Sequence, residues 1–260
     1  MGRYAIENLF GIEGLNVAWY GVIIGIGFLL GVALACHRAK RYDLKSDIVY
    51  DFILFALPVA LVCARAYYVI FQWERYANDP IKIFAVWEGG LAIYGGVLGG
   101  LLTAIVFCKH RGIPLLHFID LAAPSLVLGQ AIGRWGNFVN QEAFGNIVTA
   151  PEQQFFPYAV FIEELGEWHQ ATFFYESVWN LCLLALMLFV SRKAYRTGSL
   201  LCLYFVGYGL GRFWIEGLRT DSLFVLPGLK VSQLLSLLLI MIGVVIWFAV
   251  VRKVCKDDVE

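Results

Sequence analysis

The sequence is poor in charge: only 15% of its 260 residues are Asp, Glu, Lys or Arg, against about a quarter in a soluble domain. Its formal net charge is zero, so it lacks the basic field of a nucleic-acid-binding protein, and we expect no nucleic-acid partner. The six cysteines form no C-x-x-C pair, and the four histidines show no ligand spacing beside them. We therefore expect the cysteines to be small apolar side chains rather than metal ligands or disulfides.

Long apolar runs are what the sequence has instead, since 60% of its residues are hydrophobic. The runs have the length that crosses a bilayer as a helix. They predict an all-α polytopic membrane protein with about seven transmembrane helices, forming a single integral-membrane domain over residues 1–260. The predicted spans are Val17–Cys36, Ile48–Phe71, Leu91–Cys108, Phe118–Phe138, Phe173–Ser191, Leu200–Gly217 and Val231–Val251.

Lysine and arginine are distributed unequally between the two sets of connecting segments. One set holds twelve cations, namely Arg38, Lys40, Arg41, Lys45, Lys109, Arg111, Arg192, Lys193, Arg196, Arg252, Lys253 and Lys256. The other set holds four, namely Arg3, Arg75, Lys82 and Lys230. Because cytoplasmic loops carry the excess of cations, we expect the N-terminus outside and the C-terminus in the cytoplasm. Residues 139–171 then form a polar, outward-facing arm that is too short for its own core.

Glycines recur four residues apart within the predicted spans. Small residues at this spacing let two helix backbones approach closely in lipid, so we expect these pairs to mark helix contacts. The pairs are Gly21/Gly25, Gly27/Gly31, Gly95/Gly99, Gly96/Gly100 and Gly207/Gly211.

A dense polar motif runs from Gly133 to Gly145, at the outer end of the fourth span, with the sequence GRWGNFVNQEAFG. Ionisable residues inside a span are costly and are functional candidates by default. Arg134 is the central cation of this motif. The alternative is a merely structural arginine that snorkels beside a polar helix end.

A second cluster lies on one face of the sixth span, where Tyr204, Tyr208, Arg212, Glu216 and Arg219 follow helical spacing. An Arg212–Glu216 pair that only neutralises two buried charges is the alternative, but it leaves Arg219 unexplained. Further polar residues within spans are Arg65, Glu176, Asn180 and Asp120. For Asp120, at the cytoplasmic start of the fourth span, we expect a solvated helix start.

Several arginines in the outer half of a membrane suit a phosphate-bearing ligand, because the guanidinium fork matches phosphate oxygens. A phospholipid headgroup is the most abundant such ligand there. The residues alone therefore predict an outward-facing headgroup site, and they leave open whether it belongs to an enzyme or to a lipid or anion transporter.

The motif from Gly133 to Gly145 closely resembles the signature of the prolipoprotein diacylglyceryl transferases, bacterial enzymes that lipidate lipoprotein precursors. Other stretches agree along nearly the whole chain: Trp19-Tyr20-Gly21, Arg65 with Tyr67 and Tyr68, Glu88-Gly89-Gly90, Asp120 with Pro124, Thr172 to Ser177, Gly211 to Glu216 with Arg219, and Ser232-Gln233.

The resemblance implies transfer of the diacylglyceryl group of phosphatidylglycerol to the lipobox cysteine of a prolipoprotein signal peptide. The product is a thioether, glycerol phosphate is released, and no cofactor or metal is needed. The implied location is the bacterial cytoplasmic membrane, with the lipid bilayer as surroundings. The implied catalytic residues are Arg134, Arg212, Glu142, Glu216 and Tyr94, with both glutamates holding the arginines. The implied substrate-binding residues are Tyr20, Arg65, Asn137, Asn140, Gly145, Glu176 and Arg219.

Two positions depart from the family pattern. Tyr94 stands before Gly95-Gly96, where many members have a histidine, which puts a histidine base at that position in doubt. Gln170-Ala171 replaces a common His-Pro before Thr172; loss of a proline at a helix start is a modest change.

Overall fold

The structure, a computed structural model, describes residues 4–8, 16–77, 79–193, 195–220, 224–226 and 229–251. The cations Arg3, Arg252, Lys253 and Lys256 of the orientation argument, and the thiol of Cys255, lie outside the described residues. The other five cysteines are free thiols, and Cys108 and Cys202 are buried.

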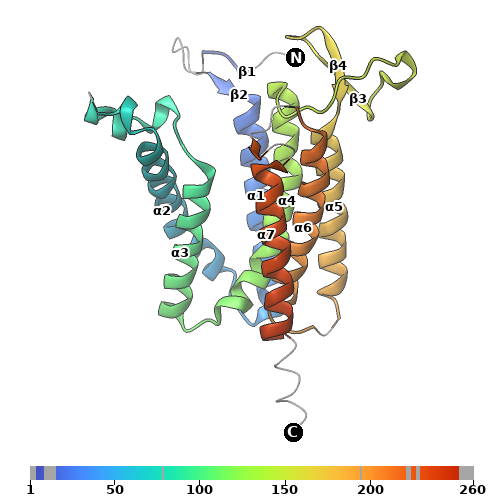
Figure 1. The fold of residues 1–260 in the computed structure, drawn as a ribbon. Helices are drawn as coiled ribbons and strands as arrows, with labels where there is room; N and C mark the ends of the chain where they lie inside the picture. Colours follow the sequence, from blue (N-terminus) through green and yellow to red (C-terminus); the bar gives the residue numbers. More distant parts are fainter. Residues whose placement is uncertain are drawn as a thin grey trace. The chain divides into compact units, whose positions relative to one another are not determined.

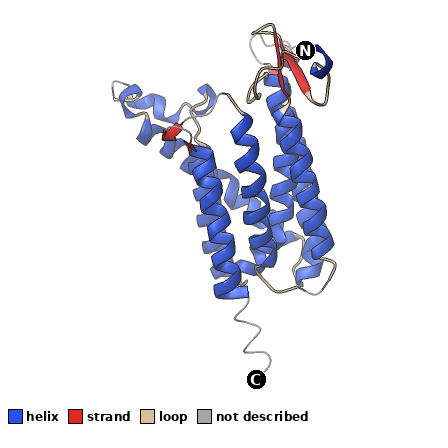
Figure 2. Ribbon diagram, turned by 45° about the vertical axis from the view of Figure 1, so that its right-hand side comes forward, coloured by secondary structure: helices blue, strands red, loops and turns tan. Residues whose placement is uncertain are grey.

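Seven α-helices dominate the described part of the chain (Figures 1 and 2). A helix satisfies its own backbone hydrogen bonds, which lipid cannot do. The predicted spans coincide with these helices to within three residues from the first to the sixth, and the seventh continues as a π-helix, η7 (Trp247–Val251). The helices are α1 (Trp19–Ala39), α2 (Asp47–Phe71), α3 (Ile93–Arg111), α4 (Leu115–Asn140), α5 (Thr172–Val190), α6 (Ser199–Leu218) and α7 (Val231–Ile246).

Six of these helices are long and apolar enough to cross a membrane among the residues that were described, and α6 is not one of the six. Helix α6 has 20 residues, which is about 30 Å of helix. Its sequence includes Arg212 and Glu216, which lower its apolar character. The protein is therefore a multi-pass membrane protein.

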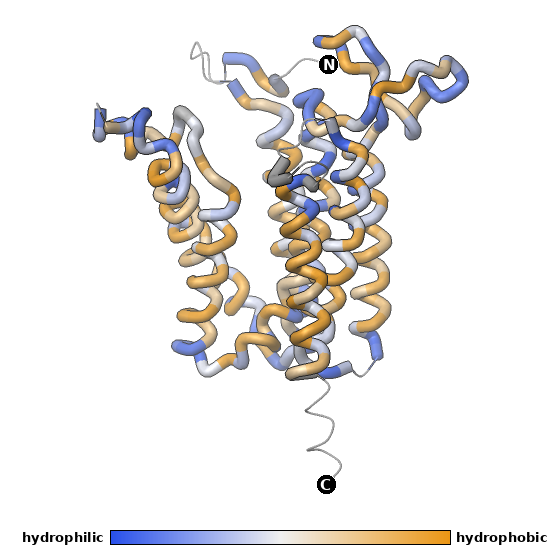
Figure 3. Tube along the Cα trace, viewed as in Figure 1, coloured by the Kyte–Doolittle hydropathy of each residue, from blue (hydrophilic) through white to orange (hydrophobic). Residues whose placement is uncertain are grey.

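The chain divides into two compact units, which we describe separately. Unit 1 comprises Met1–Ala35 and Ile119–Glu260, and unit 2 comprises Cys36–Phe118. In unit 1, helices α4 to α7 stand side by side with α1 (Figure 1). Orange apolar residues cover their length, and blue polar residues gather near the helix ends (Figure 3). The apolar core of unit 1 consists of Ala123, Val127, Leu183, Leu184, Met187 and Leu200.

Helices α2 and α3 pack tightly against each other in unit 2. A Cβ at Gly95 would lie 2.3 Å from the Cys63 carbonyl oxygen, and one at Gly99 would lie 2.9 Å from the Ala60 Cα. Both glycines therefore mark a close backbone approach, as their spacing predicts. Three 3-10 helices follow α2, namely η3 (Trp73–Arg75), η4 (Pro80–Phe84) and η5 (Val86–Glu88), and η2 (Lys40–Tyr42) precedes it.

The expectation that each glycine pair marks a contact is only partly correct. In unit 1, Gly31 allows the Ser125 carbonyl of α4 to approach, and Gly211 accommodates the Trp179 indole of α5. At Gly21, Gly25 and Gly100, by contrast, an added Cβ would meet no described atom within 4 Å. Spacing alone therefore does not distinguish a packing glycine from one that faces open surroundings.

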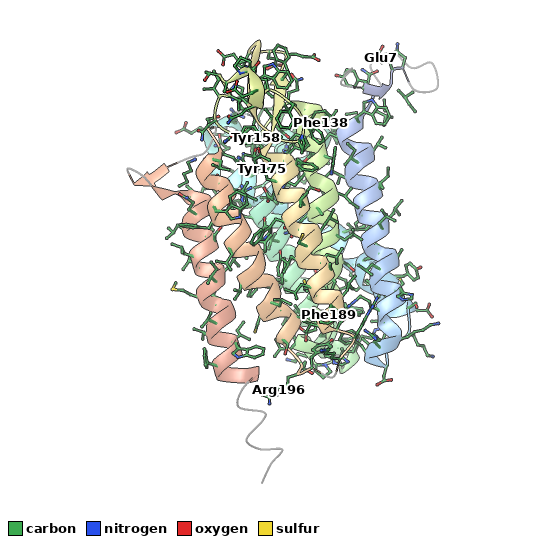
Figure 4. The ribbon with its side chains drawn as sticks, turned by 90° about the vertical axis from the view of Figure 1, so that its right-hand side faces the viewer. Glu7, Phe138, Tyr158, Tyr175, Phe189 and Arg196 are labelled. Atoms are coloured by element: carbon green, nitrogen blue, oxygen red, sulfur yellow. The ribbon has the colours of Figure 1, made fainter. Side chains whose placement is uncertain are left out.

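The segment between α4 and α5 forms a small hairpin rather than a domain. Strands β3 (Ala159–Ile162) and β4 (Glu167–Gln170) pair antiparallel, with Ala159 opposite Gln170. The Tyr175 hydroxyl on α5 donates a hydrogen bond to the Tyr158 carbonyl, which ties the hairpin to the helix end. In Figure 4, Phe138, Tyr158 and Tyr175 lie at one end of the helices, and Arg196 lies at the opposite end.

Short elements complete the described fold. They are β1 (Tyr4–Ile6), β2 (Val17–Ala18), η6 (Pro151–Gln153), β5 (Phe224–Leu226) and β6 (Leu229–Lys230). Strand β1 pairs with β2, and β5 pairs with β6.

Asp120 corrects one expectation from the sequence. It is fully buried rather than solvated. Its Oδ2 accepts the N–H of Gly198 at 2.6 Å, and its Oδ1 accepts the N–H of Leu201 at 2.9 Å. Asp120 thus caps the N-terminus of α6 from the neighbouring helix α4. The sequence position suggested a helix start because α4 was expected from Phe118, whereas α4 begins at Leu115.

Candidate active site

Arg134, Glu176 and Arg212 come from three helices of unit 1 and meet in one ion-pair cluster. Glu176 Oε1 on α5 lies 3.1 Å from Arg134 Nε on α4. Glu176 Oε2 accepts a hydrogen bond from Arg212 Nη1 on α6 at 2.9 Å. A single carboxylate therefore bridges the two arginines that the sequence analysis placed at the centre of the chemistry.

Helix α6 adds a second carboxylate to this cluster. Glu216 Oε2 lies 2.7 Å from Arg212 Nη2 and 3.5 Å from Arg219 Nη1. These pairs are four and three residues apart, the spacings at which helical side chains meet. The helical spacing predicted that these three residues lie together, and the structure brings them together as a network rather than an isolated pair.

Exposure differs between the two kinds of charge. The Glu176 and Glu216 side chains are only 4% and 3% exposed, whereas the Arg134 and Arg212 side chains are 21% and 15% exposed. The carboxylates therefore hold the arginines from the buried side, and the guanidinium groups face the more open side. Three arginines meet two carboxylates in this network.

Tyrosines continue the polar face of α6 toward the core of unit 1. Tyr204 and Tyr208 pack against the apolar core of unit 1. The Tyr204 and Tyr208 rings stack with their centroids 5.6 Å apart. Gln130 Nε2 on α4 donates a hydrogen bond to the Tyr204 hydroxyl at 2.9 Å. The ring stacking and the Gln130 hydrogen bond fix the orientation of the Tyr204 side chain.

Glu142 reaches Arg134 through an intermediate side chain rather than directly. Arg134 Nη1 donates to Asn137 Oδ1 at 3.2 Å, and Asn137 Nδ2 donates to Glu142 Oε1 at 2.9 Å. Asn140 Nδ2 also donates to Glu142 Oε1, at 3.3 Å. The helix ends at this point, with Gln141 and Ala143 in the left-handed region (φ 50° and 58°). Glu142 thus orients the two asparagines, and Glu176 is the carboxylate that directly contacts Arg134.

Gly145 lies at a crossing of three backbone segments. Its N–H donates to the Gln170 carbonyl at 3.0 Å, and it forms an isolated antiparallel bridge with Arg219. His169 Nδ1 lies 2.9 Å from the Gly145 carbonyl oxygen. A Cβ at Gly145 would lie 2.9 Å from both Gln170 Cβ and Thr172 Cγ2. Only glycine fits without displacing these neighbours, so this residue holds the motif against the hairpin and the end of α6.

Tyr20 packs against the motif from α1. A Cβ added at Gly136 would lie 2.8 Å from Cδ2 of the Tyr20 ring. Gly136 therefore allows the half-exposed tyrosine to lie against α4, two residues beyond Arg134. On the α5 side, Trp135 Nε1 donates to Ser177 Oγ at 3.1 Å, and Ser177 Oγ donates to the Ala131 carbonyl at 2.9 Å.

Comparison with known proteins assigns this arrangement to a family. The family model described as prolipoprotein diacylglyceryl transferase matches residues 7–249. The chain belongs to this family. Relatives named phosphatidylglycerol–prolipoprotein diacylglyceryl transferase include those of Bacillus velezensis, 44% identical (91% of this chain, 89% of the relative), Geobacillus kaustophilus, 45% (92% and 89%), and Gloeobacter violaceus, 46% (91% and 90%).

In this prolipoprotein diacylglyceryl transferase family member, Arg65 is used differently from the arginines of unit 1. It is buried within unit 2, and its five N–H groups donate to five backbone carbonyls. The acceptors are the carbonyls of Lys82, Ile83, Ala85, Gly89 and Gly90, at 2.6 to 3.3 Å. The guanidinium group therefore organises the loop before α3. Its expected role in substrate binding stays a prediction.

Tyr94, which replaces the common histidine, lies near the start of α3 in unit 2. Its side chain is 47% exposed, and its ring centroid lies 6.3 Å from that of Tyr67 on α2. Whether Tyr94 acts in the reaction stays a prediction.

Lys230 is a residue near the site that the sequence analysis counted only as a loop cation. It is buried, and its ammonium group donates to the carbonyls of Glu216 and Arg219 at 2.7 and 2.5 Å. The sequence gives only one signal for this contact. A lysine stands immediately before an apolar run and follows a helix that ends at Leu218.

Proposed function

We propose that this protein transfers the diacylglyceryl group of phosphatidylglycerol to the lipobox cysteine thiol of a prolipoprotein. The observation that carries the proposal is the Glu176 carboxylate shared between Arg134 and Arg212, in a chain of this family. The names of the relatives supply the lipid and the protein substrate.

The charge of the site suits the proposed lipid. A phosphodiester carries one negative charge, and three arginines take part in the ion-paired network. The partly exposed guanidinium groups offer planar donors that match phosphate oxygens. The buried carboxylates keep these donors in place while the lipid binds and leaves.

In the proposed reaction, the cysteine sulfur attacks the diacylglyceryl carbon that is bonded to a phosphate oxygen. The C–S bond forms, the C–O bond breaks, and the electron pair stays on the leaving phosphate oxygen. The thiol proton goes to the released phosphate or to water, and glycerol phosphate departs. Arg134 and Arg212 stabilise the negative charge that grows on the leaving group, which is the most effective use of fixed charges in catalysis.

The remaining residues support this centre. We propose that Glu176 and Glu216 position the arginines, and that Glu142 orients Asn137 and Asn140 toward the headgroup oxygens. Gly145 and Arg219 shape the same end of the bundle. Tyr20 and Tyr94 are proposed contacts for the headgroup or the incoming thiol. The thiol has an unperturbed pKa of about 8.5, so a small thiolate fraction is available near neutral pH.

We also propose that α6 is a seventh crossing and that the chain forms one membrane domain in the bacterial plasma membrane. The twelve-to-four distribution of cations supports an outside N-terminus and a cytoplasmic C-terminus. This orientation puts the arginine cluster and the β3–β4 arm on the outer side, where lipoprotein precursors emerge.

A lipid or anion transporter is the other function that an arginine-lined site allows, and the family relationship does not favour it. The test is a covalent product. Membranes containing the protein are incubated with phosphatidylglycerol and a lipobox peptide, and the mass of the peptide is measured by mass spectrometry. We expect a diacylglyceryl mass shift on the cysteine peptide and none on a matched peptide with serine instead. An unmodified cysteine peptide would contradict the proposed function.

A further inference from the structure

Helix α6 carries Arg212 and Glu216, and charged side chains from other helices hold both of its ends. At the N-terminus, the buried Asp120 carboxylate of α4 accepts the N–H groups of Gly198 and Leu201. These donors belong to the helix start, where backbone N–H groups lack intrahelical partners.

At the C-terminus, Lys230, which immediately precedes α7, supplies the opposite charge. Its Nζ donates to the carbonyls of Glu216 at 2.7 Å, Arg219 at 2.5 Å and Gly217 at 3.4 Å. Carbonyls in the last turn of a helix lack backbone donors. Lys230 is buried, so its ammonium group bonds to protein carbonyls in surroundings with little water.

A second contact fixes Lys230 itself. Its backbone N–H donates to Gln233 Oε1 at 3.2 Å, and Gln233 Nε2 donates to the Phe213 carbonyl of α6 at 3.3 Å. The start of α7 is thus bonded to the last turns of α6 through both residues. An ammonium group held in this way has little freedom to leave the helix end.

Both charges match the helix dipole, since a carboxylate is favourable at the N-terminus and a cation at the C-terminus. Their surroundings differ, however. The carbonyls that bind Lys230 belong to Glu216 and Arg219, and the Glu216 side chain pairs with both Arg212 and Arg219 in the cluster. Asp120 binds the other end of a 20-residue helix, about 30 Å away along its axis.

We infer that Lys230 is a positioning residue of the arginine site. By fixing the backbone of Glu216 and Arg219, it sets where the Glu216 carboxylate holds the Arg212 guanidinium. This role rests on the proposed function. It differs from simple stabilisation of the helix, because its loss misplaces the charges that meet the leaving phosphate.

The experiment compares three variants of the full-length protein in detergent or liposomes: Lys230→Met, Lys230→Arg and Asp120→Asn. For each, kcat, KM for phosphatidylglycerol and the thermal midpoint Tm are measured. Lys230→Met removes the ammonium donors while keeping a long side chain. Lys230→Arg retains a charged, multi-donor group, and Asp120→Asn weakens the opposite end of α6 as the matched control.

We expect Lys230→Met to lower kcat about tenfold with KM changed less than about twofold, because misplaced groups lose transition-state stabilisation more than binding. Lys230→Arg should recover most of kcat. Asp120→Asn should lower Tm but leave kcat of the folded protein within about twofold of wild type. If Lys230→Met does not fold, Lys230→Gln, which keeps two N–H donors without the charge, replaces it with the same expected direction.

Equal kcat in Lys230→Met and wild type, or a loss of kcat in Asp120→Asn as large as that in Lys230→Met, would overturn the positioning role. The wild-type protein in the same assay separates the two claims. A wild type that forms no thioether contradicts the proposed function, whereas an active wild type with an equally active Lys230→Met contradicts only the role of Lys230.

Discussion

Arg134 on α4 and Arg212 on α6 are joined through opposite oxygens of one buried carboxylate, that of Glu176 on α5. Because each guanidinium binds a different oxygen, their separation is set by the width of one carboxylate group. We propose that the two guanidinium groups bind neighbouring oxygens of one phosphate.

Removing either arginine should remove most of the activity. Arg134→Gln and Arg212→Gln keep a polar side chain but lose the charge that stabilises the leaving phosphate. We expect at least a 10²-fold lower transfer rate, or about 3 kcal/mol of transition-state stabilisation. The rate is measured as the appearance of the diacylglyceryl peptide, with folding checked by Tm. Near wild-type turnover in either variant would contradict the assignment.

Neutralising Glu176 should affect both stability and activity. Glu176→Gln preserves the side-chain shape but leaves two arginines without their shared counter-charge. Because breaking a buried pair leaves an uncompensated charge, we expect a loss of about 3 kcal/mol in the free energy of unfolding. Activity should fall as well, since the guanidinium groups are no longer held together. Glu152→Gln, in the exposed η6 segment, is the matched control; an equal response of both variants would refute the bridging role.

Much of this site could be predicted from the sequence because it depends on spacing within one helix. Arg212, Glu216 and Arg219 are close in sequence, and their ion pairs follow directly from helical geometry. The six apolar crossings also followed from the length of the runs. Both predictions use only local information.

Contacts between helices could not be predicted in this way. Glu176 lies 42 residues from Arg134 and 36 from Arg212, and nothing local indicates which helices are neighbours. For the same reason Asp120 was expected to be solvated, although it caps α6 across the core. The surroundings of Arg65 could not be predicted either. All its N–H donors bind backbone carbonyls, and such acceptors have no sequence signature.

Tyr94 tests the departure from the family pattern. As a proton acceptor, a phenol is a weak choice at neutral pH because its unperturbed pKa is about 10, whereas a hydrogen-bonding role requires only the hydroxyl. We expect Tyr94→Phe to lose much of the activity and Tyr94→His to keep a substantial part. A base at Tyr94 would instead add a titration to the wild-type pH–rate profile that disappears in Tyr94→Phe. Full activity of Tyr94→Phe would reduce this residue to packing.

The proposed topology is tested by labelling from one side of the membrane. In a variant without native cysteines, Glu164→Cys in the β3–β4 turn should react with a membrane-impermeant thiol reagent added outside. Lys45→Cys, between α1 and α2, should react only after the membrane is opened. The cation distribution is the reason for this expectation. The reverse pattern would place the arginine site on the cytoplasmic side.

The central claim is a group transfer, and its most direct test is to count both products together. Purified protein in phosphatidylglycerol liposomes is given a lipobox peptide, and the thioether peptide and free glycerol phosphate are quantified over time. The account predicts that they appear in equal amounts, only with a cysteine-containing peptide, and that both are lost in Arg134→Gln. Release of glycerol phosphate without thioether, or lipid movement with neither product, would contradict it.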